Sequence, residues 1–275
     1  MKLTILCENT VGRAIPAIGE HGFACCLETA AGTFLIDTGQ GLGITTNAQV
    51  LGKDLSRIDG VVLSHGHYDH AGGLEAVLRL RGEVPVYAHP DIFVPRYSKT
   101  PHSLRFIGIP QRRELLETLG ARFHETPSFQ QIAAGVFVTG TIPRSTAFEE
   151  GDGNLVQRHD DGRYTPDLFS DDMAVVVDSD KGLVVILGCA HAGIINTLNY
   201  IAEVMQRDHF YAVVGGTHLG PVSAQQFEQT VAALQGFAIE KLGVSHCTGQ
   251  SRAAQLRQIF PSQFFYGSVG AVLEV

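Results

Sequence analysis

Residues 61–74 read VVLSHGHYDHAGGL and place three histidines and an aspartate within the six positions from His65 to His70. We expect an apolar strand to end at Ser64, where small and turn-forming residues release the chain into a loop. If residues 65–67 stay extended, His65 and His67 point to the same side, because side chains of an extended chain alternate with a period of two. Two imidazoles can then bind one metal ion.

Asp69 and His70 follow at once, before two glycines at 72–73 that let the backbone turn tightly into a helix. Their side chains point elsewhere, so the motif predicts two adjacent ions, one bound by His65 and His67 and the other by Asp69 and His70. These ligands suit Zn, Fe or Mn, and two ions about 3.5–4 Å apart can clamp a phosphoryl or acyl oxygen. A loop of surface histidines is the weaker interpretation, because this spacing after a buried strand has little structural use.

Two ions need more than four ligands, and the second half of the chain supplies histidines in similar contexts. His191 (GCAHAG), His218 (GGTHLG) and His246 (VSHCTG) each follow an apolar run and lie among small residues, where the backbone can approach a ligand closely. A lone histidine is more often a hydrogen-bonded structural residue, but three in one context favour ligands. We predict His191 and His246 as metal ligands, and Asp69 and His218 as catalytic candidates. Cys189 is either a thiolate ligand or a small buried hydrophobe.

Further polar residues are candidates for supporting roles. Asp37 ends the run TFLID and is predicted to orient a ligand histidine. Asp172 precedes the run AVVV and could bridge the metals or simply begin a strand. Threonines on glycine-flanked loops can bind phosphate oxygens, although they also form turns. The substrate-binding candidates are His21, Thr217, His218 and Thr248.

Two stretches, 23–39 and 173–189, read as β-hairpins of the same design, an apolar run, a polar turn with glycine and a second apolar run. Each is followed by a further strand and loop, so the chain resembles a duplicated β-rich unit. Near-continuous Val, Leu and Ile runs indicate strands that are covered on both faces. Two central sheets with helices outside is the simplest assembly. The expected helices span 72–82, 111–121, 193–207, 223–237 and 251–260.

Segment 143–172 is polar, rich in Gly and Asp and without period, so we expect a long surface loop or lid, within an insertion at about 92–172. An aromatic substrate ring would need a slot, for which Tyr97, Phe106 and Phe148 are the candidates from this insertion. We expect one domain over residues 1–275.

The 275 residues are 44% hydrophobic and 17% charged, which allows a large core. The net charge of −8 argues against nucleic-acid binding, which usually needs a basic stripe. No signal peptide or membrane span is expected from the apolar runs. Five cysteines without a C-x-x-C spacing fit a reducing cytoplasm. The oligomeric state, including a homo-oligomer, is left open.

The stretch SHGHYDHAGGL, with LIDTG upstream, resembles the metallo-β-lactamase superfamily. The wider set EHGFA, GLVVILGCAHAGIIN, GGTHL and SHCTG is similar to one branch, named for 7,8-dihydropterin-6-yl-methyl-4-(β-D-ribofuranosyl)aminobenzene 5′-phosphate synthase, over about residues 8–270. The resemblance implies an α/β fold, the αββα sandwich made of two similar halves, with a dinuclear metal site at one edge of the sheets.

Carried over to this chain, the superfamily pattern assigns His65 and His67 to one metal, Asp69 and His70 to the other, and His246 to the last histidine ligand. Many members have a bridging aspartate at the end of the strand that here reads GCAHAG, so Cys189 takes that position. The bridge is therefore Cys189, Asp172 or none.

The resemblance implies a metal-dependent transferase or hydrolase acting on a small, phosphorylated molecule, as in a dihydropterin synthase-type condensation with loss of pyrophosphate. Hydrolysis of phosphoesters or lactones is the main alternative. Redox chemistry at a di-iron centre is less favoured, since related proteins pair this fold with a flavin domain. The non-enzymatic alternative is a metal-dependent module that binds or senses a small molecule. β-Lactam hydrolysis and RNA processing are disfavoured by the lack of a secretion signal and by the acidic charge.

Overall fold

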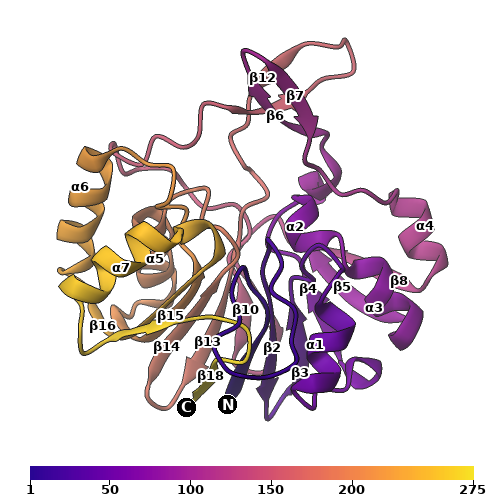
Figure 1. The fold of residues 1–275 in the computed structure, drawn as a ribbon, viewed down its shortest axis with the longest axis horizontal. Helices are drawn as coiled ribbons and strands as arrows, with labels where there is room; N and C mark the ends of the chain where they lie inside the picture. Colours follow the sequence, from indigo (N-terminus) through magenta and orange to yellow (C-terminus); the bar gives the residue numbers. More distant parts are fainter.

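Two seven-stranded sheets lie face to face at the centre of the computed structural model, which describes residues 1–275 (Figure 1). The first sheet has the order β18-β1-β2-β3-β4-β5-β8 and the second β17-β16-β15-β14-β13-β10-β9. The strands of the first sheet are β1 (Lys2–Cys7), β2 (Ala24–Thr29), β3 (Gly32–Ile36), β4 (Gly60–Val62), β5 (Val84–Ala88), β8 (Ala121–Glu125) and β18 (Val272–Glu274). Those of the second are β9 (Gln130–Ala133), β10 (Val136–Val138), β13 (Ala174–Ser179), β14 (Gly182–Leu187), β15 (His209–Gly216), β16 (Ala238–Ser245) and β17 (Phe264–Tyr266).

Helices cover the outer face of each sheet, one group on either side of the sandwich in Figure 1. The α-helices are α1 (Ile44–Val50), α2 (Tyr68–Ala71), α3 (Leu74–Arg81), α4 (Arg113–Thr118), α5 (Ile194–Met205), α6 (Ala224–Leu234) and α7 (Gln250–Ile259). Short 3-10 turns are η1 (Leu55–Arg57), η2 (Pro90–Phe93) and η3 (His246–Thr248). All five helices expected from the sequence are present. Helix α1 was not expected, because its sequence ITTNAQV has no clear apolar period.

The two predicted hairpins are confirmed as β2–β3 and β13–β14. In each half the hairpin continues into parallel strands, β4, β5 and β8 in the first and β15, β16 and β17 in the second. The β-branched run AVVV opposite LVVIL favours the extended chain, and Gly182 at φ +131° closes the tight turn between them. The two halves are therefore built alike.

Three apolar layers hold the sandwich together. Between the sheets lie Ile5, Phe23, Val62, Val175 and Val214 with their neighbours. A second cluster joins the first sheet to α1, α3 and α4, and a third joins the second sheet to α5, α6 and α7. Strands of both sheets are thus covered on two faces, as their unbroken apolar runs predicted. The α/β fold of αββα type is confirmed.

A third, smaller sheet projects beyond the sandwich, at the top of Figure 1, and we call it the outlying sheet. Its order is β12-β11-β6-β7, from β6 (Arg96–Thr100), β7 (Ser103–Phe106), β11 (Leu155–Arg158) and β12 (Tyr164–Pro166). The prediction of a segment without regular structure at 143–172 was wrong in this respect, because β11 and β12 lie within it. Each is only three or four residues long, and β11 pairs with β6, far away in the sequence. A local pattern carries no signal of such pairing.

Candidate metal centre

The candidate site residues gather at one edge of the two main sheets, where several strands end. Ser64 and His65 follow β4, Cys189 and His191 follow β14, and His218 follows β15. His246 comes directly after β16. Because the carboxyl ends of parallel strands meet at the same edge, residues more than a hundred positions apart become neighbours.

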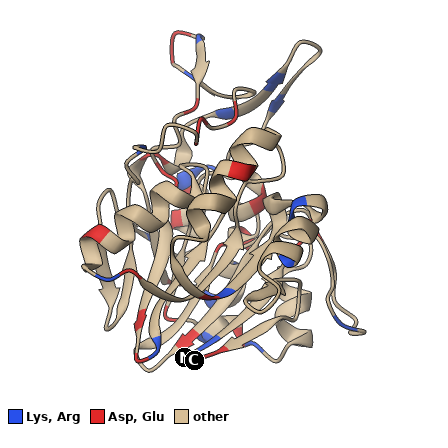
Figure 2. Ribbon diagram, turned by 90° about the vertical axis from the view of Figure 1, so that its left-hand side faces the viewer, with Lys and Arg blue, Asp and Glu red and all other residues tan.

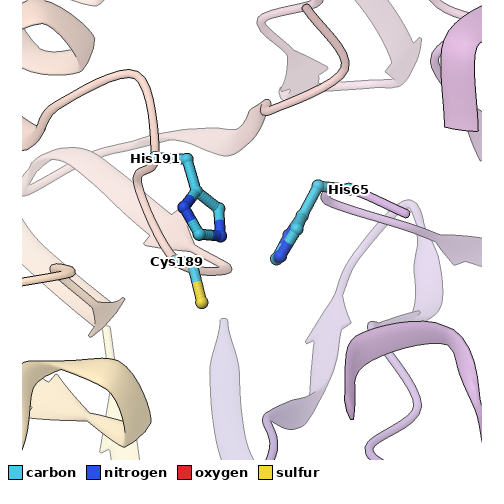
Figure 3. A group of neighbouring side chains, drawn as sticks. All are labelled: His65, Cys189 and His191. Atoms are coloured by element: carbon cyan, nitrogen blue, oxygen red, sulfur yellow. The ribbon is translucent and has the colours of Figure 1, made fainter. Parts of the chain in front are cut away.

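The first group of donors consists of His65, His67, Cys189 and His191. Nε2 of His65 lies 3.1 Å from Nδ1 of His67. One donor atom each of His65, Cys189 and His191 lies within 4.8 Å of the others. Figure 3 shows His65 on one side and Cys189 and His191 on the other, with their donor atoms directed into a common space. Nε2 of His67 and Nε2 of His191 are buried without a hydrogen-bond partner, an arrangement that a metal ion would satisfy.

The second group consists of Asp69, His70 and His246, again with Cys189. Nε2 of His70 lies 3.2 Å from Sγ of Cys189, and Nε2 of His246 lies 3.3 Å from Oδ2 of Asp69. The exposed His21 approaches the same carboxylate oxygen at 3.1 Å. Cys189 belongs to both groups, so its sulfur is the shared element of the two donor sets.

The other nitrogen of three of these histidines is fixed by a neighbour. Nδ1 of His65 contacts the Ser64 hydroxyl at 2.9 Å, Nδ1 of His70 contacts Asp37 at 2.7 Å, and Nδ1 of His246 contacts the Asn9 side chain at 2.9 Å. Each contact turns the remaining Nε2 toward the centre. This is the arrangement by which proteins orient metal-binding histidines and set their tautomer.

Burial and neighbouring charges set the protonation of the cluster. Burial lowers the pKa of His67 to about 3 and also lowers the pKa values of His65 and His191, so these rings are neutral and each keeps one unprotonated nitrogen. Burial raises the pKa of Asp69, but hydrogen bonds from His21 and His246 outweigh burial and hold this pKa well below its usual range.

His70 and Cys189 differ from their neighbours. Burial alone would lower the pKa of His70, but the Asp37 carboxylate outweighs burial and raises this pKa to about 9. Burial raises the pKa of the Cys189 thiol, so this sulfur holds its proton until a cation replaces it.

Backbone strain is concentrated at this edge. Six non-glycine residues have φ between +50° and +55°, a left-handed backbone conformation that residues other than glycine rarely adopt. Five of them belong to the cluster or touch it, namely Asp37, Phe169, Ala190, His218 and His246. Strain of this kind persists only where surrounding contacts impose it, and it is typical of functional sites.

The structure brings most predicted residues together, but it places others elsewhere. Asp37 contacts His70 as expected. Asp172 belongs to neither donor group. Its Oδ2 accepts from the backbone N–H of Ala192 and so supports the loop that carries His191, while its Oδ1 is buried without a hydrogen-bond partner. The hydroxyls of Thr217 and Thr248 lie 2.9 Å apart in a buried pair.

Two cavities adjoin the cluster. One, of about 250 Å³, runs between the donor groups and the outlying sheet, and the other, of about 260 Å³, extends toward α5 and α6. His191 and His218 line both, and neither ring nitrogen of His218 has a hydrogen-bond partner. Tyr97, Phe106 and Phe148 line neither of these two cavities, so the aromatic slot expected from them is not part of either.

Several residues of the site were missed by the sequence analysis. Glu8 accepts from the backbone N–H of His246 at 2.7 Å, and Asn9 contacts its ring. The ring of Phe169 stacks on that of His191, with centroids 4.1 Å apart and an angle of 4°. Asp171 accepts from the backbone N–H of Gly66 and holds the loop between His65 and His67. All are distant in sequence from the groups they support.

Sequence comparison agrees with this geometry. The metallo-β-lactamase superfamily profile matches residues 22–201, which include the SHGHYDHAGGL stretch and Cys189 and His191. The chain belongs to the metallo-β-lactamase superfamily. One curated relative is the 7,8-dihydropterin-6-methyl-4-(β-D-ribofuranosyl)-aminobenzene-5′-phosphate synthase of Methanocaldococcus jannaschii, 26% identical over 100% of this chain and 96% of the relative. An uncharacterised protein of the same organism is 32% identical over 99% of this chain and all of its own length.

Two solved structures show the same fold. The crystal structure of Tm1679, described as a metal-dependent hydrolase of the β-lactamase superfamily, superposes with a TM-score of 0.86 at 29% identity, covering 100% of this chain and 99% of the other. Zn²⁺-bound PqqB from Methylobacterium extorquens matches with a TM-score of 0.58 at 12% identity over the full length of both chains. The second likeness concerns the fold alone. None of the helices has the length and apolarity that crossing a membrane demands.

Proposed function

We propose that this member of the superfamily is a metal-dependent enzyme that hydrolyses phosphoesters of small molecules at a dinuclear centre. The observation that supports the proposal most strongly is the convergence of two donor groups on the shared sulfur of Cys189. Zn, Mn and Fe are the divalent ions that suit imidazole, carboxylate and thiolate ligands together.

The proposed ligands are His65, His67 and His191 for one ion and Asp69, His70 and His246 for the other, with Cys189 between them. The donor set fits such ions, because the unpartnered Nε2 atoms of His67 and His191 need an electron-pair acceptor. Ser64, Asp37 and Asn9 fix the rings of three ligands. When bound, two divalent ions would polarise a phosphoryl or acyl oxygen and activate water.

His218 is the proposed proton donor to the leaving group. Its ring lies beside that of His191, with centroids 4.3 Å apart, the residue lines both cavities, and its two ring nitrogens are buried without a hydrogen-bond partner. Asp69 is held as a carboxylate by His21 and His246. Its proposed catalytic role is to bind the second ion. The hydroxyls of Thr217 and Thr248 hydrogen-bond to each other, and Thr217 directly precedes His218. Both threonines are proposed contacts for phosphate oxygens.

A second candidate reaction is a condensation of the dihydropterin synthase type with loss of pyrophosphate. It is favoured by the full-length similarity to the synthase of M. jannaschii. The cavity that extends from His191 toward α6 offers room for a second substrate. Lactones are the third substrate class for the same centre.

We further propose that residues 1–275 form one domain, with an insertion or lid within about 92–172. The outlying sheet is the proposed lid, since β8, β9 and β10 of that segment belong to the two main sheets. The cytoplasm is the proposed location, because the five cysteines are free thiols. A small molecule is the proposed partner, rather than nucleic acid or membrane, and the net charge of −8 agrees with this choice.

The test is a turnover screen of the metal-loaded protein with a phosphomonoester, a phosphodiester, a lactone, and the pterin pyrophosphate and aminobenzene phosphate pair. We expect phosphoester hydrolysis that is lost in His65→Ala and retained in His209→Ala, since His209 begins β15 at the opposite edge. Condensation without hydrolysis would support the synthase instead. Full metal loading without turnover of any compound would favour the binding module.

A further inference from the structure

The two faces of the hairpin β6–β7 in the outlying sheet differ, because one faces the donor groups and the other faces away from them. Ser98 and Arg105 are paired across the hairpin and line the cavity beside the donor groups. Tyr97 and Phe106 form the adjacent pair; their rings pack on each other, and the Tyr97 ring also packs on that of Tyr164. Since side chains alternate along a strand, the aromatic pair lies on the outer face and Arg105 on the face toward the metal centre.

Arg105 is held in place by the metal-binding loop itself. Its Nη1 donates to the hydroxyl of Tyr68 at 3.1 Å, and the guanidinium lies 5.3 Å from the centroid of the Tyr68 ring. Tyr68 stands between His67 and Asp69, and its backbone N–H donates to the carbonyl of Ile107, just after β7. The loop that presents the donors therefore also positions the arginine.

Arg105 is the one Lys or Arg side chain in the lining of that cavity. Two other arginines near the site are occupied. Arg96 is buried between Asp167 and Asp171, and Arg144 donates to the backbone carbonyls of His191 and Glu149. Arg105 has no carboxylate partner and makes its side-chain hydrogen bond with Tyr68 alone. Figure 2 shows basic residues on the outlying sheet, at the top of the view.

The carboxylates of the cavity do not cancel this charge. Asp69 contacts His21 and His246 within the second donor group, and Asp152 lies 4.0 Å from the ring of His218. A guanidinium with free donors, held over a site and exposed to solvent, matches a phosphate or carboxylate oxygen pair.

We propose that Arg105 is a substrate-binding residue that selects molecules carrying a second anionic group, a phosphate or carboxylate, remote from the bond that reacts at the metal centre. The inference rests on the proposed function for the identity of that centre, and it adds the chemistry of the other end of the substrate. Tyr68 acts as the positioning residue for the guanidinium.

Two pairs of probes that differ by one phosphate test this proposal. For binding, calorimetry compares thymidine 5′-monophosphate with thymidine 3′,5′-bisphosphate on the metal-loaded protein. For turnover, thymidine 5′-(p-nitrophenyl phosphate) is compared with the same ester carrying a 3′-phosphate. We expect the wild type to prefer the doubly anionic member of each pair, and Arg105→Ala to weaken that preference about tenfold or more.

The variants separate charge from structure. Arg105→Lys should restore part of the preference, and Tyr68→Phe, which removes the hydroxyl but keeps the ring, should reduce it less than Arg105→Ala. Lys99→Ala is the matched control, because Lys99 lies on the outer face of the same hairpin, over the ring of Tyr164. It should leave both preferences unchanged.

An equal preference in wild type and Arg105→Ala, or no preference in the wild type, would overturn the proposal. So would an equal loss in Lys99→Ala, which would indicate a general effect of charge. If Arg105 controls the binding preference while neither ester is hydrolysed, the proposed hydrolysis fails and the role of Arg105 stands.

Discussion

Replacing Asp37 by asparagine tests how far the proposed metal centre depends on a carboxylate that is not itself a proposed ligand. Asp37 is fully buried and accepts three hydrogen bonds of 2.7 Å, from the Ser64 backbone N–H, the Ser64 hydroxyl and Nδ1–H of His70. An amide offers one oxygen, so either the Ser64 N–H or the His70 N–H must face the NH₂ group. One buried donor is then left unpaired.

The magnitude follows from that loss. An unsatisfied buried group costs about 1–3 kcal/mol of folding stability. Loss of the partner that orients a ligand histidine typically lowers metal affinity by about 10–100-fold. We therefore expect Asp37→Asn to bind zinc about 10–100-fold more weakly than the wild type.

The assay is a competition titration with a chromophoric zinc chelator. Asp59→Asn is the matched control, because Asp59 accepts from the backbone N–H of Thr33 at an exposed position. It should bind zinc as the wild type does. Zinc affinity within twofold of the wild type in Asp37→Asn would refute the role of Asp37, even if the variant melts at a lower temperature.

Three further predictions concern pH, a buried ion pair and a crowded glycine. Burial lowers the pKa of His70 from its ordinary value of 6.5, but the Asp37 carboxylate outweighs burial and raises this pKa to about 9. Below pH 9, therefore, a proton occupies Nε2 of His70 in the metal-free protein. Zinc affinity should therefore rise with pH up to about 9, and a zinc affinity that is flat from pH 6.5 to 9 would contradict this. In the metal-free protein, the stability contributed by the Asp37–His70 pair should be full below about pH 6.5 and should be lost as the pH rises through 9. Arg96→Met leaves Asp167 and Asp171 buried without their cation and should lower the free energy of unfolding in urea by about 3–5 kcal/mol, with the exposed Arg79→Met as an unaffected control. Gly66→Ala places a Cβ 2.0 Å from the carbonyl oxygen of Ile92 and should lower both the melting temperature and the zinc content, while Gly153→Ala, with open space around it, should change neither; equal melting curves for the two variants would count against the tight packing of the loop.

The sequence carries those parts of the site that are local. Three histidines and an aspartate within six positions predict ligands, because their spacing fixes their directions relative to the backbone. His191 and His246 could be chosen from their contexts, since each follows an apolar strand and lies among small residues. The hairpins and helices were predictable for the same reason, as periodic patterns within one segment.

The remainder depends on contacts that no local pattern encodes. Asn9 orients His246 from 237 positions away, and Asp171 supports Gly66 from 105 positions away. Arg105 was not singled out, because its importance arises from the pairing of β6 with β7 and from the contact with Tyr68. The short strands β11 and β12 were mistaken for a loop, since three or four residues carry too weak an alternation.

The proposed function requires two ions that are bound by ligands from both halves of the chain. The most direct test is the metal content per chain, by elemental analysis after anaerobic purification, of the wild type, His67→Ala, His191→Ala and the control His209→Ala. We expect nearly two ions in the wild type and the control, with loss in both other variants. One ion in the wild type, or a metal content that His191→Ala leaves unchanged, would contradict it.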